Sequence, residues 1–338
     1  MTRTSKSEIE AAERSCRPEI DSAQAAQTPK AAFNLGVHCE DRGDLAGAER
    51  AYRQAIASGN ADHAPKAAVN LGVLCEGRGD FVGAEEAFQV AIDSGHADFA
   101  PMAAVNLGVL RDDRDGAERA YQLAIDSGHA DQAPKAAVNL GVLRERRGDY
   151  VGAEQAYQVA IDSGHRDMAP TAAVNLGVLR ERGGDLEGAE QAYRLAIDSR
   201  HTDRAPKAAV NLGVLCERRE DFAGAELAYR VVIDSGHADQ APQAAVNLGV
   251  LCHGRDDFDG AESAFQLVIA SGHADLAPKA AFNLAVLREG QGDLAGAQRA
   301  CQLAIDSGHP LAASCAREMM TELQRRSGAS AAICDRTP

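Results

Sequence analysis

The sequence predicts an all-α protein, an α-solenoid of about eight stacked helix-turn-helix repeats. The octamer AAVNLGVL occurs six times unchanged, beginning at Ala67, Ala103, Ala136, Ala172, Ala208 and Ala244. Its asparagine belongs to a set of eight that recur at intervals of 36 residues, as from Asn34 to Asn70, except for 33 residues between Asn106 and Asn139. Because self-similarity at such a period is the signature of a repeat array, the chain is not a set of separate globular domains.

One unit, residues 65–100, shows why each half is predicted to be a helix. The first half, from Pro65 to about Arg78, has a proline in its opening turn, where the missing N–H costs nothing. Gly79 and Asp80 are a C-cap and an N-cap in succession. The second half runs from Phe81 to Ser94, and its apolar residues recur at helical spacing. One hairpin alone cannot bury that apolar stripe, so the units are expected to stack.

The repeat pattern sets the expected boundaries along the chain. Residues 1–27 are predicted to be a degenerate N-terminal half-repeat that acts as a cap, because AAERSCRPEIDS aligns with the second-helix sequence GAERAYRQAIAS. Residues 28–309 hold eight repeats, of which the third lacks three residues at its turn. This shortening is either a tolerated deletion or a hinge. Residues 310–327 are expected to be a C-terminal capping helix, and residues 328–338 a disordered tail.

Composition excludes several classes of function. The net charge of −15 argues against nucleic-acid binding, which depends on clustered Lys and Arg. No apolar run approaches the ~20 residues that cross a bilayer, and the polar N-terminus lacks the apolar core of a signal peptide. We therefore expect a cytoplasmic protein that binds neither nucleic acid nor membrane and needs no cofactor.

Half of the eight cysteines occupy one helical column, which they share with arginines. The column consists of Cys39, Cys75, Arg111, Arg144, Arg180, Cys216, Cys252 and Arg288. A framework cysteine would not be exchanged for arginine, and packed helices ~8–10 Å apart hold such sulfurs too far apart to share a zinc ion. Partly buried free thiols in a reducing compartment are the expected state.

The unit resembles the tetratricopeptide repeat, whose signature is Leu-Gly in the first helix followed by Ala, an aromatic residue and Ala in the second. The matching residues of one unit are Leu71, Gly72, Ala84, Phe88 and Ala91. The aromatic column is Tyr52, Phe88, Tyr121, Tyr157, Tyr193, Tyr229 and Phe265, ending in Cys301. The family's Trp is replaced by Ala, its first-helix Tyr by the Cys/Arg column, and each unit is two residues longer. Sel1-like repeats are a neighbouring family of similar hairpins. The resemblance implies a right-handed superhelix with first helices on its concave surface.

Each unit except the first carries a histidine after its second helix: His96, His129, His165, His201, His237, His273 and His309, with Asn60 in the first unit. In most units an aspartate precedes it by three residues, which predicts a local Asp-to-His pair. One His and one Asp per unit fall short of the ligands that a zinc site needs. We expect the motif to close the helix C-terminus, with Gly left-handed and His complementing the helix dipole. No catalytic set or phosphate-binding loop stands out, so we predict no enzyme and no metal site.

The asparagine lies at the edge of a mixed Lys/Val face on the helical wheel of the first helix. The eight residues are Asn34, Asn70, Asn106, Asn139, Asn175, Asn211, Asn247 and Asn283. A primary amide can pair with a peptide N–H and C=O together, so a ladder of amides can hold a main chain whatever its side chains are. Rungs ~10 Å apart match about every third residue of an extended chain. This geometry resembles the asparagine ladder in the tetratricopeptide arm of O-linked N-acetylglucosamine transferase.

Lysine precedes the asparagine by one turn in five units: Lys30, Lys66, Lys135, Lys207 and Lys279. The pattern resembles part of the carboxylate clamp of co-chaperones, but Met102, Thr171 and Gln243 interrupt it, so clamp specificity is not predicted. The asparagines and lysines together are the predicted peptide-binding residues. In the alternative, the asparagines bridge adjacent first helices and set their register, or are inherited by recent duplication.

The sequence therefore predicts a non-catalytic protein–protein interaction module that binds a peptide segment of a partner protein in its concave groove. Two alternatives remain. The first is a structural or oligomerisation scaffold that uses the outer faces of the second helices or the exposed ends. The second is the regulatory arm of a multi-domain enzyme whose catalytic part is elsewhere.

Overall fold

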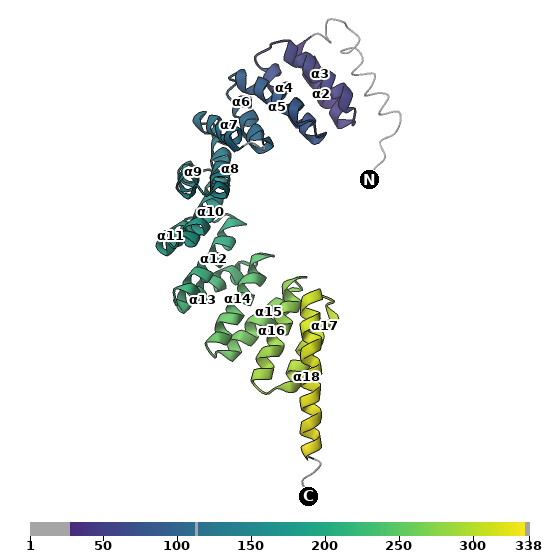
Figure 1. The fold of residues 1–338 in the computed structure, drawn as a ribbon, viewed down its shortest axis with the longest axis vertical. Coiled ribbons are helices and arrows are strands. Elements are labelled where there is room, and N and C mark those ends of the chain that lie inside the picture. Colours follow the sequence, from purple (N-terminus) through teal and green to yellow (C-terminus); the bar gives the residue numbers. More distant parts are fainter. Residues whose placement is uncertain (1–27, 112–113, 335–338) are drawn as a thin grey trace. The chain divides into compact units, whose positions relative to one another are not determined.

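A computed structural model describes residues 28–111 and 114–334, which fold into helices joined by short turns (Figure 1). The first helices of the eight repeats are α2 (Pro29–Asp41), α4 (His63–Gly77), α6 (Phe99–Leu110), α8 (Gln132–Arg147), α10 (Met168–Gly183), α12 (Arg204–Arg218), α14 (Gln240–Gly254) and α16 (Leu276–Gly290). The second helices are α3 (Leu45–Ala57), α5 (Phe81–Asp93), α7 (Arg114–Asp126), α9 (Tyr150–Asp162), α11 (Leu186–Asp198), α13 (Phe222–Ser235), α15 (Phe258–Ser271) and α17 (Leu294–Asp306). Helix α18 (Pro310–Cys334) follows them. The predicted all-α solenoid of helical hairpins is confirmed.

The chain forms two compact units, Met1–Ala169 and Pro170–Pro338. Within the first unit α2 packs on α4, α4 on α6 and α6 on α8, in addition to the contacts within and between consecutive hairpins. Within the second unit α12 packs on α14, α14 on α16 and α16 on α18. Second helices of neighbouring repeats make no comparable contacts among the described residues of either unit. The first helices are therefore on the inner side of each unit.

The turn inside most hairpins has the predicted caps; in the sixth and seventh repeats Glu220 and Asp256 take the left-handed position of the glycine. In the second repeat Gly79 adopts the left-handed conformation with φ 76°, which a residue without Cβ adopts at no steric cost. The carboxylate of Asp80 then accepts a hydrogen bond from the backbone N–H of Gly83 at 3.0 Å, satisfying an orphan donor of α5. The aspartates that cap second helices in this way are Asp44, Asp80, Asp149, Asp185, Asp221, Asp257 and Asp293.

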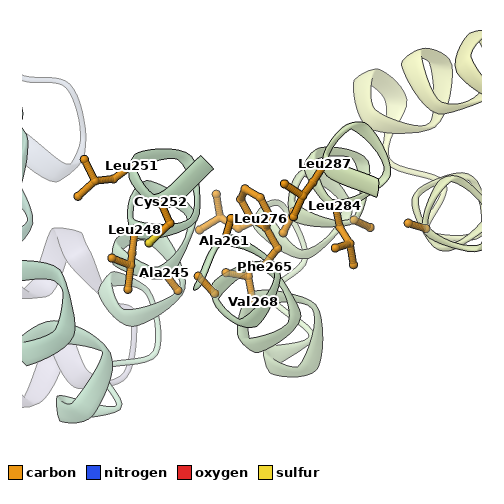
Figure 2. Close-up of a cluster of buried hydrophobic side chains, with 14 of the residues drawn as sticks. Ala245, Leu248, Leu251, Cys252, Ala261, Phe265, Val268, Leu276, Leu284 and Leu287 are labelled. Carbon is orange, nitrogen blue, oxygen red and sulfur yellow. The ribbon is translucent and has the colours of Figure 1, made fainter. Parts of the chain in front are cut away.

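The core of each repeat is an aromatic ring of the second helix seated on a glycine of the first. A Cβ at Gly72 would overlap the ring of Phe88, which explains why Gly follows Leu in the repeated octamer. In the last repeat Cys301 takes the place of the aromatic residue, and Ala285 takes the place of the glycine. Figure 2 shows Phe265 of α15 among apolar side chains of the first helices α14 and α16, within a continuous buried cluster.

Charged pairs between neighbouring repeats follow a rule that involves the Cys/Arg column. Where the column residue is arginine it pairs with a glutamate of the preceding second helix, as Arg144 does with Glu118 (Nη2 to Oε1, 2.7 Å). Where it is cysteine, an arginine three residues later takes over, as Arg78 does with Glu49 (2.7 Å).

The residue four positions after that glutamate covaries with the column. It is Arg53, Arg194 or Arg230 before Cys75, Cys216 or Cys252, and Gln89, Gln122, Gln158 or Gln266 before Arg111, Arg144, Arg180 or Arg288. Each of these arginines forms an ion pair with its own glutamate, at 2.7–2.9 Å. Within each unit, the described interfaces between repeats thus supply a cation to the glutamate by one of two arrangements.

Two boundaries differ from those predicted. Helix α18 ends at Cys334, whereas the sequence places the start of a disordered tail at residue 328. The single Gly328 costs ~1 kcal/mol of helix propensity, but three alanines follow it, and alanine is the strongest helix former. In the third repeat α6 has 12 residues against 15 in α4, so the missing residues shorten the end of the first helix. The predicted cap at residues 1–27 lies outside the described residues.

Candidate functional site

The candidate site is the exposed side of the first helices, which we call the first-helix face. It consists of the eight asparagines, the residue four positions before each and the valine three positions after each. These positions lie about one turn apart on the same side of a helix. The asparagines are half-buried, except that Asn34 is exposed. Lys30, Lys66, Lys135 and Lys207 are exposed, whereas Lys279 is half-buried and pairs with Asp275 (2.7 Å).

Valine makes this face partly apolar. Val73, Val109, Val214, Val250 and Val286 are 38–60% exposed, and the remaining valines of the column are half-buried. An exposed valine adds little to helix stability, because its β-branched side chain lowers helix propensity. Each repeat except the third, which has Met102 at the first position, therefore presents a cation or polar residue, an amide and an apolar group in a row.

The structure gives three of the asparagines a partner in the preceding repeat. The side-chain Nδ2 of Asn70 donates to the hydroxyl of Tyr52 at 3.3 Å, and that hydroxyl donates to Oε2 of Glu40 at 2.7 Å. Asn211 and Asn247 hydrogen-bond Tyr193 and Tyr229 in the same way. These tyrosines donate to Glu181 and Glu217. At these positions the amide links neighbouring repeats.

The tyrosine hydroxyls in these bridges are held protonated. Burial, and then the hydrogen bond to Glu40, raise the pKa of Tyr52 above its ordinary value, and the bond from Asn70 opposes that rise. Burial and a glutamate raise the pKa of Tyr193 and of Tyr229 in the same order. Each phenol is therefore a donor to its carboxylate and an acceptor for the amide.

Other asparagines have no such partner. The aromatic residue behind Asn106 is Phe88 and the one behind Asn283 is Phe265, and neither ring has a hydroxyl group. The amide nevertheless remains at both positions. Asn247 differs again, because its Oδ1 accepts from Gln243 at 3.0 Å. The asparagine column thus contains amides bonded within the protein and amides whose aromatic residue in the preceding repeat has no hydroxyl group.

The histidines act differently from the sequence prediction. Nδ1 of His129 accepts hydrogen bonds from the backbone N–H groups of Asp131 (3.1 Å) and Gln132 (3.2 Å), at the start of α8. His129 is therefore an N-terminal cap of the next helix and does not complement the C-terminal dipole of the preceding one. In the first repeat Asn60 does the same with Oδ1, which accepts from Asp62 and His63.

The predicted local Asp-to-His pair is also wrong. Asp126 accepts from Gln122 on its own helix (2.8 Å), and Nε2 of His129 instead faces Asp98 of the preceding repeat (3.6 Å). Corresponding pairs join His165 to Asp131, His237 to Asp203 and His309 to Asp275. Because Nδ1 accepts from backbone donors, Nε2 carries the proton that points to this carboxylate.

The described residues offer neither a metal centre nor a membrane-spanning helix. Across residues 28–111 and 114–334, no three His, Cys, Asp or Glu residues are placed to hold a metal ion. No helix in the described part of the chain has the length and apolarity needed to cross a bilayer. Cys39, Cys75, Cys216, Cys252, Cys301 and Cys315 are free thiols. Burial raises the pKa of Cys75 and, to about 11, that of Cys252.

Fold and face together define a helical repeat protein of the α-solenoid class. Family models of the tetratricopeptide repeat match residues 12–63, 40–98 and 110–166, and a second such model matches residues 242–266. The chain belongs to the tetratricopeptide repeat family. No curated protein matches the sequence.

Solved structures show the same fold at low sequence identity. A protective antigen of uropathogenic Escherichia coli that displays an SLR fold is 20% identical, with a TM-score of 0.53 over 89% of this chain and 65% of the antigen. The C-terminal part of a TPR repeat-containing protein from Cytophaga hutchinsonii is 13% identical, with a TM-score of 0.50 over 70% of this chain and 94% of that one. The fold therefore resembles both Sel1-like (SLR) and tetratricopeptide repeats, the two families that the sequence resembles.

The tyrosine partners of the asparagines and the capping role of the histidines were not predicted from the sequence. A signal for the first was present, because Tyr52 precedes Asn70 by the same number of residues as Tyr193 precedes Asn211 and Tyr229 precedes Asn247. A signal for the second was the asparagine at position 60, since Asn is a common N-cap residue and occupies the histidine position of the first repeat.

Proposed function

We propose that this chain is a non-catalytic protein–protein interaction module whose first-helix face holds a peptide segment of a partner protein. The observation that carries the proposal is the retention of Asn106 and Asn283 in front of phenylalanines. Asparagine is a poorer helix former than alanine, so an amide without a partner in the protein costs stability. A role in holding a ligand main chain supplies the reason for keeping it.

Two further features support a peptide as the ligand. The exposed valines beside the amides offer apolar contact to the peptide side chains. Four exposed lysines on the same face favour a segment that carries carboxylates. Within each unit the first helices also pack against one another, which supports a row of successive amides.

The test compares two pairs of asparagines in one protein. A peptide is selected from a random display library on the full chain, and its affinity is measured for the parent, for Asn106→Ala with Asn283→Ala, and for Asn70→Ala with Asn247→Ala. Each lost hydrogen bond is worth roughly 0.5–1.5 kcal/mol, so the first pair should weaken binding about tenfold and leave the melting temperature level or higher. The second pair should also melt lower, because it breaks bonds to Tyr52 and Tyr229. Full affinity in the first variant would rule out a ladder that grips the peptide.

A second candidate is a scaffold that uses the second helices. An apolar column on their outer side consists of Val90, Leu123, Val159, Leu195, Val231, Leu267 and Leu303, which are 43–55% exposed. If this column is the interaction surface, Leu195→Ser with Val231→Ser should abolish partner capture or self-association, and the asparagine variants should not.

A further inference from the structure

A surface pocket of about 450 Å³ lies beside the shortened third repeat. Its walls come from three helices: Glu76 at the end of α4, Phe81, Val82 and Glu85 at the start of α5, and Val109 to Arg111 where α6 ends. Because α6 stops at Leu110, about one turn earlier than its counterparts, this stretch of the interface is not covered by a longer first helix.

The apolar part of the pocket is strongly exposed. Phe81 is 60%, Val82 69% and Val109 60% exposed. At the position of Phe81, Phe222 and Phe258 are 39% and 37% exposed, and Tyr150 is 60% exposed. Three large apolar groups gathered around one pocket are a typical anchor site for an apolar side chain of a partner.

The pocket also holds a carboxylate without a partner. In four repeats the glutamate at this position accepts a hydrogen bond from the tyrosine of its own hairpin: Glu40, Glu145, Glu181 and Glu217. In the second repeat the aromatic residue is Phe88, which cannot donate, yet Glu76 is retained. Glu76 makes no side-chain hydrogen bond or ion pair with any residue in the described parts of the chain.

Two other repeats lack the tyrosine, and neither leaves a carboxylate unpaired. In the eighth repeat Cys301 replaces the tyrosine, and Glu289 pairs with Arg326. In the seventh repeat, where Phe265 replaces the tyrosine, His253 replaces the glutamate. The other carboxylate of the pocket, Glu85, is already paired with Nε of Arg111 at 2.5 Å. Glu76 is therefore the negative group of this pocket that is left for a ligand, half-buried beside an apolar wall.

We infer that this pocket docks a segment of a partner protein in which an arginine or lysine stands next to an apolar side chain. The apolar side chain packs on Phe81, Val82 and Val109, and the cation donates to Glu76. The net charge of −15 also favours the approach of a basic segment. The site is separate from the proposed amide ladder, since of the first-helix face it includes only Val109.

A small probe with the same two groups tests the pocket. Nα-benzoyl-L-arginine amide combines an apolar ring with a guanidinium group, and Nα-benzoyl-L-citrulline amide is its uncharged isostere. Binding of both to the full chain is followed by NMR, through the methyl resonances of valine. We expect millimolar binding of the arginine probe, with shifts of Val82 and Val109, and binding about fivefold to tenfold weaker for the citrulline probe.

Two matched variants test whether Glu76 is the carboxylate that binds the guanidinium group of the probe. Glu76→Gln should make the two probes bind equally, whereas Glu86→Gln removes the same charge from an exposed site on α5 outside the pocket and should keep the difference between them. Equal binding of the two probes to the parent would overturn the inference, as would an unchanged preference in Glu76→Gln. Equal loss in both variants would mean general attraction to an acidic surface and would also overturn it.

Sedimentation at increasing protein concentration tests whether a second copy of the chain occupies the pocket instead. If the chain self-associates and Glu76→Gln abolishes the association, the pocket belongs to a second copy, and the inferred basic segment is wrong. Because both variants leave every asparagine and lysine of the first-helix face in place, failure here is distinct from failure of the proposed function.

Discussion

Asn70 and Tyr52 belong to different repeats, and the 3.3 Å contact from the amide nitrogen to the phenol oxygen joins them. The same hydroxyl donates to Glu40 at 2.7 Å, so one buried oxygen connects the second helix of a repeat to two first helices. The same bridge joins neighbouring hairpins at Tyr193 and Tyr229. Phenylalanine cannot form this bridge, because its ring has no hydroxyl group.

The bridge predicts opposite effects for a matched pair of substitutions. Tyr52→Phe removes the donor to Glu40 and the acceptor for Asn70, and should lower the free energy of unfolding by about 1–2 kcal/mol. Phe88→Tyr places a hydroxyl between Glu76 and Asn106 and should raise it by up to about 1 kcal/mol. Urea unfolding followed by circular dichroism measures both. A loss of stability in Phe88→Tyr would show that the second repeat cannot form the bridge.

The Cys/Arg column predicts a coupling between two positions on neighbouring helices. Cys75→Arg alone adds a third guanidinium around Glu49, which already pairs with Arg53 and Arg78, and should be destabilising. Adding Arg53→Gln converts this interface to the arrangement found between Gln89 and Arg111, and should recover the loss. A double-mutant cycle should give a coupling energy on the order of 1 kcal/mol, and strict additivity would show that the covariation has no energetic basis.

The capping histidines predict that asparagine, but not alanine, can replace them. His129→Ala leaves the N–H groups of Asp131 and Gln132 without their acceptor and should cost about 1 kcal/mol of stability. His129→Asn should be close to neutral, because Asn60 already forms the same cap. Thermal unfolding distinguishes them, and equal melting temperatures for the two variants would contradict a capping role.

The buried phenols and thiols predict loss of stability in alkali. Their pKa values in the folded protein are raised, to about 11 for Cys252 from 9.0, so the unfolded chain releases its protons first as the pH rises. The stabilising effect of these neutral groups is fully present below the ordinary pKa and is lost as the pH rises toward the folded value. Unfolding free energies from urea titrations should therefore fall from about pH 9 upward. Cys252→Ala should reduce that slope between about pH 9 and 11 relative to the parent, and an unchanged slope would exclude the contribution of this thiol.

The sequence by itself determined the fold. The interval between asparagines fixed the repeat, helical spacing fixed two helices in each, and Gly79 followed by Asp80 marked the turn, since these signals act within one or two turns of chain. It also placed asparagine, lysine and valine on one side of the first helix, because the period of a helix alone decides which of its residues share a side.

Only the tertiary structure decided what that side touches. Asn70 meets Tyr52 because stacking brings the second helix of one repeat against the first helix of the next, and Gly72 and Phe88 meet because the two helices of a hairpin pack closely. The ring of His129 reaches the next helix because a left-handed glycine, Gly128, turns the chain before it. A contact between residues far apart in the chain depends on how helices pack, and the period of one helix carries no information about its neighbour.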